Sequence, residues 1–384
     1  MKRFGLVPLV ALLLVLLAQL CVSPRIPPAA IDVLPTRLSD AAFWKLVTDL
    51  SEEGGYFRSD NLISNEDTFQ QVIPTLRERL PAGGVYLGVG PDQNFTYLVA
   101  VQPKLAFIVD IRRQNLLLHL MYKALIELSA DRAELLSRLF SRPRPADLDP
   151  ASSAPALFAA FDAVTASEAL FTRNSAEIVE RLVQMHRFAL SDEDLRGIDY
   201  VYRAFYAGGP DLRYSFPRQF GGGRGFALGF PSYAELMMAT DAEGEPHSYL
   251  ASERNYQLLR AYELSNLVVP VVGDFGGEKA LRSIAAYLRG HGATVTLFYT
   301  SNVEQYLFQS SAWRRFFDNL AALPVDGNSA LLRSFFNTGY QYGFGARPLR
   351  GGRSAMLLDS IPSLLTAVRG GHVQSYYDVI ERSR

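Results

Sequence analysis

The chain has 384 residues, of which 48% are hydrophobic and 20% are charged, so it can bury a core and is neither disordered nor fibrous. Its 38 Lys and Arg residues almost balance its 39 Asp and Glu residues, which gives a formal net charge of −1. This balance argues against nucleic acid as a partner, because phosphate binding usually requires an excess of basic charge. The single cysteine, Cys21, lies in the first apolar run, which excludes disulfides, cysteine-based zinc sites and cysteine nucleophiles from the folded part.

The amino terminus predicts a membrane-targeting segment. Lys2 and Arg3 precede the uncharged run FGLVPLVALLLVLLAQLCVS, which is long enough to cross a bilayer as a helix. The basic flank places the following domain on the extracytoplasmic side. A signal peptide, a lipoprotein signal and an uncleaved signal anchor are the three interpretations of residues 1–23. Leu20 before Cys21 disfavours the lipoprotein signal, and the length of the run favours the anchor over cleavage.

A tether and two helices are predicted to follow. Residues 24–36, PRIPPAAIDVLPT, contain four prolines and predict a stiff, non-helical tether between the membrane and a folded unit at 37–384. Ser39 is the predicted N-cap of a helix through SDAAFWKLVTDLSEE. Residues 65–80 predict a second helix, which Pro74 kinks or divides.

The next segments alternate between buried strands and helices. Residues 85–89 predict a short strand that ends in Gly-Pro-Asp-Gln-Asn, and a helix follows across FTYLVAVQ. The apolar run LAFIVD, residues 105–110, is typical of a parallel strand buried on both faces. Residues 115–128 predict another helix. Strand, helix, strand, helix is the unit of a doubly wound α/β sheet.

Further strands are predicted late in the chain. Residues 267–274 and 293–302 read as apolar strands separated by the amphipathic helix EKALRSIAAYLRGHG, and residues 354–361 as an edge strand. Residues 129–265 predict a mostly helical insertion with room for one further strand. The expected fold class is therefore α/β: a doubly wound, mostly parallel, Rossmann-like sheet with a large helical insertion and an N-terminal membrane segment.

The ends of the first two strands predict a nucleoside site. In open α/β sheets, ligands bind beyond the carboxyl ends of the strands. Gly88 and Gly90 end the first strand, where a missing side chain lets a ligand approach the backbone. Asp110 follows Gly90 by twenty residues and ends the next strand, where nucleotide-binding folds place an acid whose two oxygens accept from the ribose hydroxyls. The alternative is a tight turn in which Asp110 caps the following helix.

Polar residues also follow the later strands. Asp274 ends the third predicted strand, and Asn302 and Glu304 follow the fourth, where catalytic groups collect in this architecture. Ser301 and Asn302 also suit helix caps. The five histidines are scattered without the spacing of metal ligands, so no metal site is predicted. His119 lies within an apolar helix, where we expect it to pack.

Several of these segments resemble the class I S-adenosylmethionine-dependent methyltransferase fold. VYLGVGPDQN is similar to the first motif of that family, LAFIVD to its second, and VVPVVGDF to the motif after its fourth strand. The resemblance covers roughly residues 65–128 and 266–308. The stretches GVGPDQNFTY, FIVDIRRQN, PVVGDF and YTSNVEQYLF are also similar to a bacterial family without an established function.

The resemblance implies roles for individual residues. Gly88 and Gly90 would flank the methionine part of S-adenosylmethionine, and Asp110 would hold its ribose. Asp274 would lie near the transferred methyl group, so that Asp274, Asn302 and Glu304 are the candidate polar groups at the methyl acceptor.

The first motif departs from the family pattern. Tyr86 stands where the family has an acid, and Asp92 where it has its third glycine. Asp92 is therefore the candidate substitute partner for the ammonium group of the cofactor, and Asn94 is the remaining polar candidate of this loop. Gln93 occupies the last position of the nicotinamide-type G-x-G-x-x-G, so that motif is incomplete.

Two functional hypotheses follow. The first is a membrane-anchored, methyltransferase-like protein that binds S-adenosylmethionine or a related nucleoside and modifies an acceptor that the sequence does not reveal. The second is a non-catalytic extracytoplasmic binding or envelope protein that keeps the fold, which the altered first motif and the predicted export favour. One scaffold hosts many functions, so fold analogy does not decide between them. The expected partners are a small nucleoside and the membrane, and the oligomeric state is not indicated.

Overall fold

The computed structural model describes residues 33–146, 148–214, 229–336 and 354–383. The predicted leader lies outside these ranges. None of the helices within them is both long enough and apolar enough to span a bilayer. The described end of the predicted tether is attached to the domain, because Leu34 is buried in the core.

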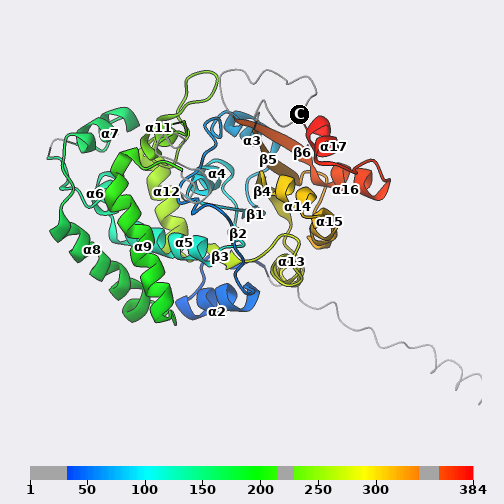
Figure 1. Ribbon diagram of the computed structural model, residues 1–384, viewed down its shortest axis with the longest axis horizontal. Helices are drawn as coiled ribbons and strands as arrows, with labels where there is room; N and C mark the ends of the chain where they lie inside the picture. Colours follow the sequence, from blue (N-terminus) through cyan, green and yellow to red (C-terminus); the bar gives the residue numbers. More distant parts are fainter. Residues whose placement is uncertain (1–32, 147, 215–228, 337–353, 384) are drawn as a thin grey trace, which may run out of the picture.

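A six-stranded sheet organises the chain, in the order β3-β2-β1-β4-β5-β6 (Figure 1). All neighbouring strands run parallel except β5 and β6, so the architecture is α/β with a mostly parallel sheet, as predicted. The strands are β1 (Val85–Gly88), β2 (Leu105–Asp110), β3 (Val268–Val272), β4 (Val295–Ser301), β5 (Ala330–Phe336) and β6 (Ser354–Ser360).

The apolar pattern explains which strands lie in the middle. Every residue of β1, β2 and β3 is buried, since these runs have no polar face to turn toward water. The partly exposed β6 is the predicted edge strand. The extra strand expected within residues 129–265 does not lie in the described part of that segment. The sheet instead contains β5, ALLRSFF, which the sequence pattern does not predict because the buried Arg333 interrupts its apolar run.

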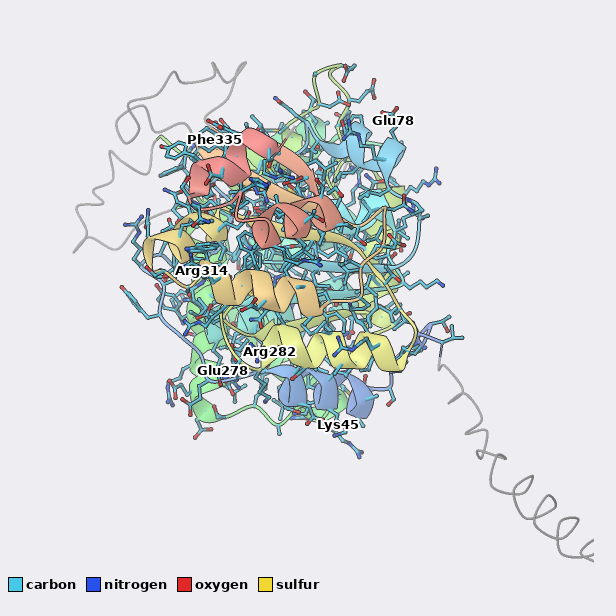
Figure 2. The ribbon with its side chains drawn as sticks, turned by 90° about the vertical axis from the view of Figure 1, so that its right-hand side faces the viewer. Lys45, Glu78, Glu278, Arg282, Arg314 and Phe335 are labelled. Atoms are coloured by element: carbon cyan, nitrogen blue, oxygen red, sulfur yellow. The ribbon has the colours of Figure 1, made fainter. Side chains whose placement is uncertain are left out.

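Helices cover both sides of the sheet. On one side α13 contacts both α2 and α15, and α15 contacts α16; the helices that carry Lys45, Arg282 and Arg314 lie one above the other in Figure 2. These helices are α2 (Asp40–Leu50), α13 (Ala280–Gly290), α15 (Trp313–Ala322) and α16 (Ile361–Arg369), with α14 (Val303–Gln309) and α17 (Tyr376–Arg382) beside them. On the other side, α5 (Arg113–Leu128) packs on β2 and β3, while α3 (Ile73–Arg79) and α12 (Glu253–Leu264) pack on α4 (Gln93–Val101).

The chain between α5 and β3 is mostly helical and packs on α5 through α9 and α12. Its described residues contain isolated bridges but no strand of the sheet. The helical elements before α12 are α6 (Arg132–Leu139), α7 (Ala154–Asp162), α8 (Glu168–Val179), the π-helix η1 (Glu180–Met185), α9 (Asp192–Gly208), the 3-10 helix η2 (Gly209–Asp211) and α11 (Tyr233–Met238).

The helix predicted at 65–80 is shorter than expected. Only Ile73–Arg79 is helical, because Pro74 occupies the first turn, where the N–H group that proline lacks has no helical partner. The preceding residues 51–66 form an irregular segment across the carboxyl ends of the strands. The N–H group of Glu52 donates to the carbonyl of Val272 at the end of β3 (3.0 Å). This segment therefore covers the edge of the sheet at which the sequence predicts a site.

Candidate functional site

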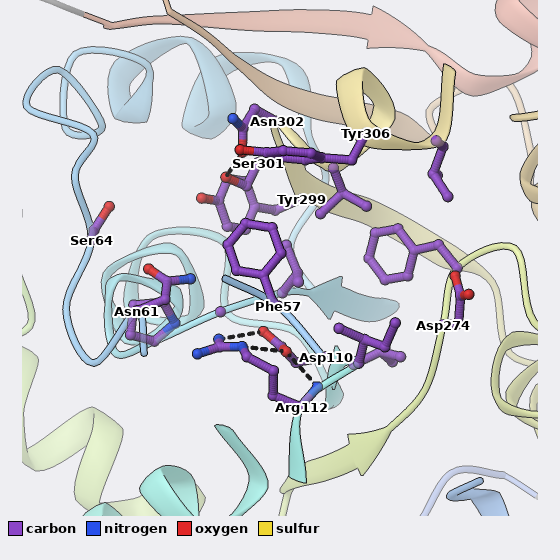
Figure 3. A pocket seen from close by; sticks show the side chains of 18 of the residues that line it. Phe57, Asn61, Ser64, Asp110, Arg112, Asp274, Tyr299, Ser301, Asn302 and Tyr306 are labelled. Carbon is purple, nitrogen blue, oxygen red and sulfur yellow. Dashed lines mark hydrogen bonds and ion pairs between the residues drawn. The ribbon is translucent and has the colours of Figure 1, made fainter. Parts of the chain in front are cut away.

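A cavity of about 570 Å³ lies beyond the carboxyl ends of β1, β2, β3 and β4 (Figure 3). Gly90, Asp110, Asp274 and Ser301 line it from the four strand ends, and residues of the 51–66 segment close it. The strand order reverses here, because β2 and β3 lie on one side of β1 and β4 on the other. The volume is within the range of roughly 300–1,000 Å³ that is typical of small-molecule sites.

The side chain of Asn94 holds the loop after β1 in place through hydrogen bonds to its backbone carbonyls. Gly90 lines the cavity with φ +80°, a conformation that glycine adopts without strain. The Nδ2 group of Asn94 donates to the carbonyls of Val89 (2.9 Å), Gly90 (3.3 Å) and Pro91 (2.6 Å), and its Oδ1 accepts from the hydroxyl of Tyr86 (2.7 Å). Asn94 is fully buried and does not line the cavity, so it positions the loop rather than contacting a ligand.

Gly88 also serves internal packing. A Cβ atom at this position would lie 2.0 Å from Oδ1 of Asn94 and 2.7 Å from the Tyr86 ring. The missing side chain thus makes room for the Tyr86–Asn94 hydrogen bond and not for a ligand. His119 packs beneath the same loop: burial lowers its pKa to about 4, and the neutral ring donates from Nε2 to the carbonyl of Gly90 (2.9 Å).

Asp110 lines the same cavity as the Gly90 loop, but Arg112 already occupies most of its hydrogen-bonding capacity. Arg112 donates from Nε to Oδ1 (3.0 Å) and from Nη2 to Oδ2 (2.8 Å), as Figure 3 shows. The backbone N–H of Arg112 also donates to Oδ1 (2.9 Å), which makes Asp110 a local partner of the turn before α5. Both lone pairs of Oδ1 are taken and one remains on Oδ2. The sequence-based expectation was that both oxygens are free to accept hydroxyls, whereas the structure leaves only Oδ2 with a free lone pair.

Asp92 lies beneath the loop and outside the cavity lining. It is 2% exposed, and the hydroxyl of Tyr249 donates to its Oδ2 (2.9 Å). Burial raises its pKa to about 7, while the hydrogen bond from Tyr249 opposes this shift. Asp92 is thus poorly placed to hold an ammonium group in the cavity, contrary to the sequence-based expectation.

The raised pKa of Asp92 predicts a pH-dependent stability. The unfolded residue loses its proton near its ordinary pKa of 3.8, whereas the folded residue keeps the proton up to about pH 7. The contribution of Asp92 to stability therefore falls as pH rises through this window, by on the order of 4 kcal/mol in total. We expect Asp92→Asn, which cannot ionise, to match the wild type near pH 4 and to be more stable at pH 8. Urea unfolding at both pH values tests this, and parallel stability curves would contradict it.

Asp274 lines the cavity from a different strand than the resemblance implies. The strand before it is β3, which pairs with β2 at the edge of the sheet, whereas the strand beside β1 is β4. Asp274 therefore lies on the opposite side of β1 from Ser301, and the expected position near a transferred methyl group is corrected. Its Oδ1 accepts from the N–H of Gly276 (2.8 Å), and its own N–H donates to Oε1 of Glu52 (2.6 Å).

Of the two candidate residues after β4, Asn302 and Glu304, only Asn302 lines the cavity. Asn302 lines the cavity and makes no side-chain capping bond, although it precedes the first residue of α14. Glu304 is 1% exposed and points into the core, where Arg333 of β5 donates from Nε to its Oε2 (2.6 Å). The structure thus leaves Asn302 at the cavity and removes Glu304 from it.

Glu66 is an acid of the cavity that the sequence did not suggest. It is 1% exposed and accepts from the hydroxyls of Tyr299 (2.8 Å) and Ser301 (2.5 Å) and from Nε2 of Gln93 (2.8 Å). Burial raises its pKa. Ser301 has φ +51°, which is strained for a residue with a side chain and is typical of functional sites. Glu66 stood within the predicted 65–80 helix, and no local pattern distinguishes it there.

Aromatic rings form another wall of the cavity. Phe57 and Tyr306 line it and pack edge to face, with ring centroids 5.2 Å apart. In the view of Figure 3, Phe57 lies between the Asp110–Arg112 pair and the group around Ser301. Phe57 belongs to the irregular segment, which has no helical or strand periodicity from which its position could be predicted.

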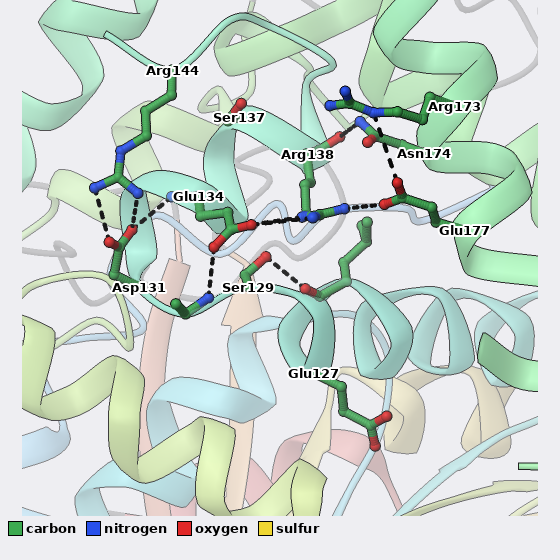
Figure 4. A network of polar contacts seen from close by, with 12 residues as sticks. Glu127, Ser129, Asp131, Glu134, Ser137, Arg138, Arg144, Arg173, Asn174 and Glu177 are labelled. Carbon is green, nitrogen blue, oxygen red and sulfur yellow. Dashed lines mark hydrogen bonds and ion pairs between the residues drawn. The ribbon is translucent and has the colours of Figure 1, made fainter. Parts of the chain in front are cut away.

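A second hollow of about 490 Å³ lies among the helices of the insertion. Figure 4 shows the polar contacts of several residues that line it, among them Arg138, Arg144 and Arg173. Arginines are prominent in its lining, but their charge is not available to a ligand. Each guanidinium is already paired with a carboxylate: Arg138 with Glu134 (3.1 Å), Arg144 with Asp131 (2.8 Å) and Arg173 with Glu177 (3.8 Å). The cavity at the strand ends is therefore the better candidate site.

Residues 61–147 and 152–348 match the model of a family described as a domain of unknown function, DUF7790. The match covers more than half of the chain. The chain belongs to this family. No curated protein matches the sequence. The DUF7790 match includes all five parallel strands and Glu66, whereas Phe57 lies before it.

Proposed function

We propose that the cavity binds S-adenosylmethionine or a closely related nucleoside, and that the protein is a methyltransferase of the doubly wound, Rossmann-like class. The observation that carries the proposal is that the Gly90 loop and Asp110 line one cavity where the strand order reverses. The order 3-2-1-4-5 is that of doubly wound nucleotide-binding sheets, and an antiparallel edge strand such as β6 is a common addition to them.

The proposed pose follows the order of the strands. The free lone pair on Oδ2 of Asp110 accepts one ribose hydroxyl, and Arg112 keeps the carboxylate in place. The nucleobase then extends toward β3 and Asp274, and the methionine part passes the Gly90 loop toward β4. Ser301 and Asn302 face the methyl group. The protein contributes mainly by holding the acceptor and the methyl group in line.

Calorimetric titration of the full-length protein in mild detergent with S-adenosylmethionine and S-adenosylhomocysteine tests this proposal. We expect saturable binding, which weakens roughly 10- to 100-fold in Asp110→Asn, because a hydrogen bond to a charged acceptor contributes about 1.5–3 kcal/mol. Asp318→Asn, which replaces an exposed aspartate of α15, is the matched control and keeps full affinity. Absence of heat with both ligands at millimolar concentration, in a folded protein, would overturn the proposal.

A second candidate is a membrane-anchored, extracytoplasmic protein that binds a nucleoside without transferring a methyl group. Two of the side chains expected at the methyl acceptor already have other partners, which favours this candidate. Glu304 is paired with Arg333, and Asp274 accepts a hydrogen bond from the backbone N–H of Gly276. Incubation with S-adenosylmethionine labelled in its methyl group distinguishes the two, because only an enzyme transfers label to components of a cell extract. A reporter fused to the carboxyl terminus reveals on which side of the membrane the domain lies.

A further inference from the structure

The cavity is acidic. Among the described residues that line it, the ionisable carboxyl and basic side chains are Glu66, Asp110, Asp274 and Arg112. Arg112 forms a two-pronged pair with Asp110, so Glu66 and Asp274 have no cationic partner within the described lining. Such a site repels an anionic group and attracts a cation.

Aromatic rings line one side of the same cavity. Phe57, Tyr299 and Tyr306 line the β4 side of the cavity, and the first and last of them pack edge to face. The faces of such rings attract cations, with about 0.5–2 kcal/mol for each contact. Tyr306 already makes one such contact, because the guanidinium carbon of Arg58 lies 5.7 Å from its ring centroid.

Glu66 connects to this aromatic wall through Ser301. The hydroxyl of Ser301 lies on the cavity lining and donates to Oε1 of Glu66 at 2.5 Å. Tyr299 and Gln93 hold the carboxylate from the other sides. The β4 side thus combines a buried carboxylate, a hydroxyl that reaches the cavity and aromatic rings.

We propose that the β4 side of the cavity binds an organic amine in its ammonium form, with Phe57, Tyr299 and Tyr306 around the nitrogen and the Ser301–Glu66 pair as its hydrogen-bonding and charge partner. This assigns a chemical class to the methyl acceptor. Binding of the amine depends only on the residues described, whereas its methylation rests on the proposed function.

Ser301 and Glu66 can also accept the proton that an ammonium group must lose before its nitrogen is methylated. The nitrogen gives one proton to Oγ of Ser301 while the Ser301 hydroxyl proton passes to Glu66. The freed lone pair forms the nitrogen–carbon bond as the carbon–sulfur bond breaks and its electron pair stays on sulfur. The products are a methylated ammonium ion and a neutral thioether, and Glu66 later returns the proton to water.

Saturation-transfer NMR on the full-length protein tests amine binding with benzylamine, a cation at neutral pH, and benzyl alcohol, its neutral counterpart. We expect benzylamine to bind at least 10-fold more tightly and Glu66→Gln to remove this preference. Ser301→Gly also removes the hydroxyl while relieving the left-handed backbone conformation, so it keeps the proposal testable if Glu66→Gln does not fold. Phe57→Leu weakens the binding of benzylamine more than that of benzyl alcohol.

The outcomes separate the two proposals. Equal binding of both probes by the wild type, or a preference that survives Glu66→Gln and Ser301→Gly, overturns the amine site. If S-adenosylhomocysteine binds and benzylamine does not, the amine site is wrong and the nucleoside proposal stands. If benzylamine binds selectively and neither S-adenosyl compound does, the nucleoside proposal is wrong and the amine site stands.

Discussion

Replacing Arg333 by methionine is expected to lower the free energy of unfolding by about 3–5 kcal/mol, the cost of breaking a buried ion pair from one side. Arg333 is fully buried in β5 and donates from Nε to Glu304 (2.6 Å) and from Nη1 to Asp359 (3.4 Å). Its removal leaves Glu304, which is 1% exposed, without a cation. Urea unfolding followed by circular dichroism measures the loss.

The double variant Arg333→Met with Glu304→Met is the control. It removes the unpaired charge of Glu304 but leaves Asp359 without Arg333, and it is expected to recover part of the loss, because apolar side chains of similar volume replace buried ion pairs well. Equal stability of the single and double variants would contradict the assignment. The double variant also tests the sequence-based expectation for Glu304: if it stays folded and still binds nucleoside, Glu304 has no role at the ligand.

This ion pair illustrates what the sequence does not reveal. Patterns of apolar residues predict strands that are uniformly apolar, and β5 is not, because Arg333 lies in its centre. The partner Glu304 precedes it by 29 residues and lies on another element. The contact between Arg333 of β5 and Glu304 of α14 therefore explains both the missed strand and the wrong expectation for Glu304.

The residues of the candidate site likewise fall into those that local sequence patterns predict and those that they do not. Gly90 and Asp110 end apolar strands, and parallel strands bring their carboxyl ends to one edge, so local patterns suffice to predict a common cavity. Asp274 was assigned to the wrong neighbour because strand order is not a local property. Phe57 and Glu66 come from the irregular 51–66 segment, where no periodicity indicates which side chains point inward.

Asn94→Ala is expected to destabilise the domain by about 2–4 kcal/mol, because leaving buried polar groups without partners costs about 1–3 kcal/mol each. The variant removes the donor to the carbonyls of Val89, Gly90 and Pro91 and the acceptor for the hydroxyl of Tyr86. His119 still donates to Gly90, so the loss is partial. Thermal unfolding measures the stability.

Ligand binding distinguishes this role from direct contact. Asn94 shapes the loop that lines the cavity. We therefore expect Asn94→Ala to lower the affinity for S-adenosylhomocysteine at least 10-fold, even at a temperature where the variant is fully folded. Asn94→Asp keeps the acceptor for Tyr86 but turns a carboxylate toward carbonyl oxygens, so it does not rescue binding. Asn328→Ala, in an exposed turn, is the matched control and changes neither stability nor binding. Full affinity in a folded Asn94→Ala variant would mean that the loop holds its shape without this side chain, and the site would then depend on Asp110 and the β4 side alone.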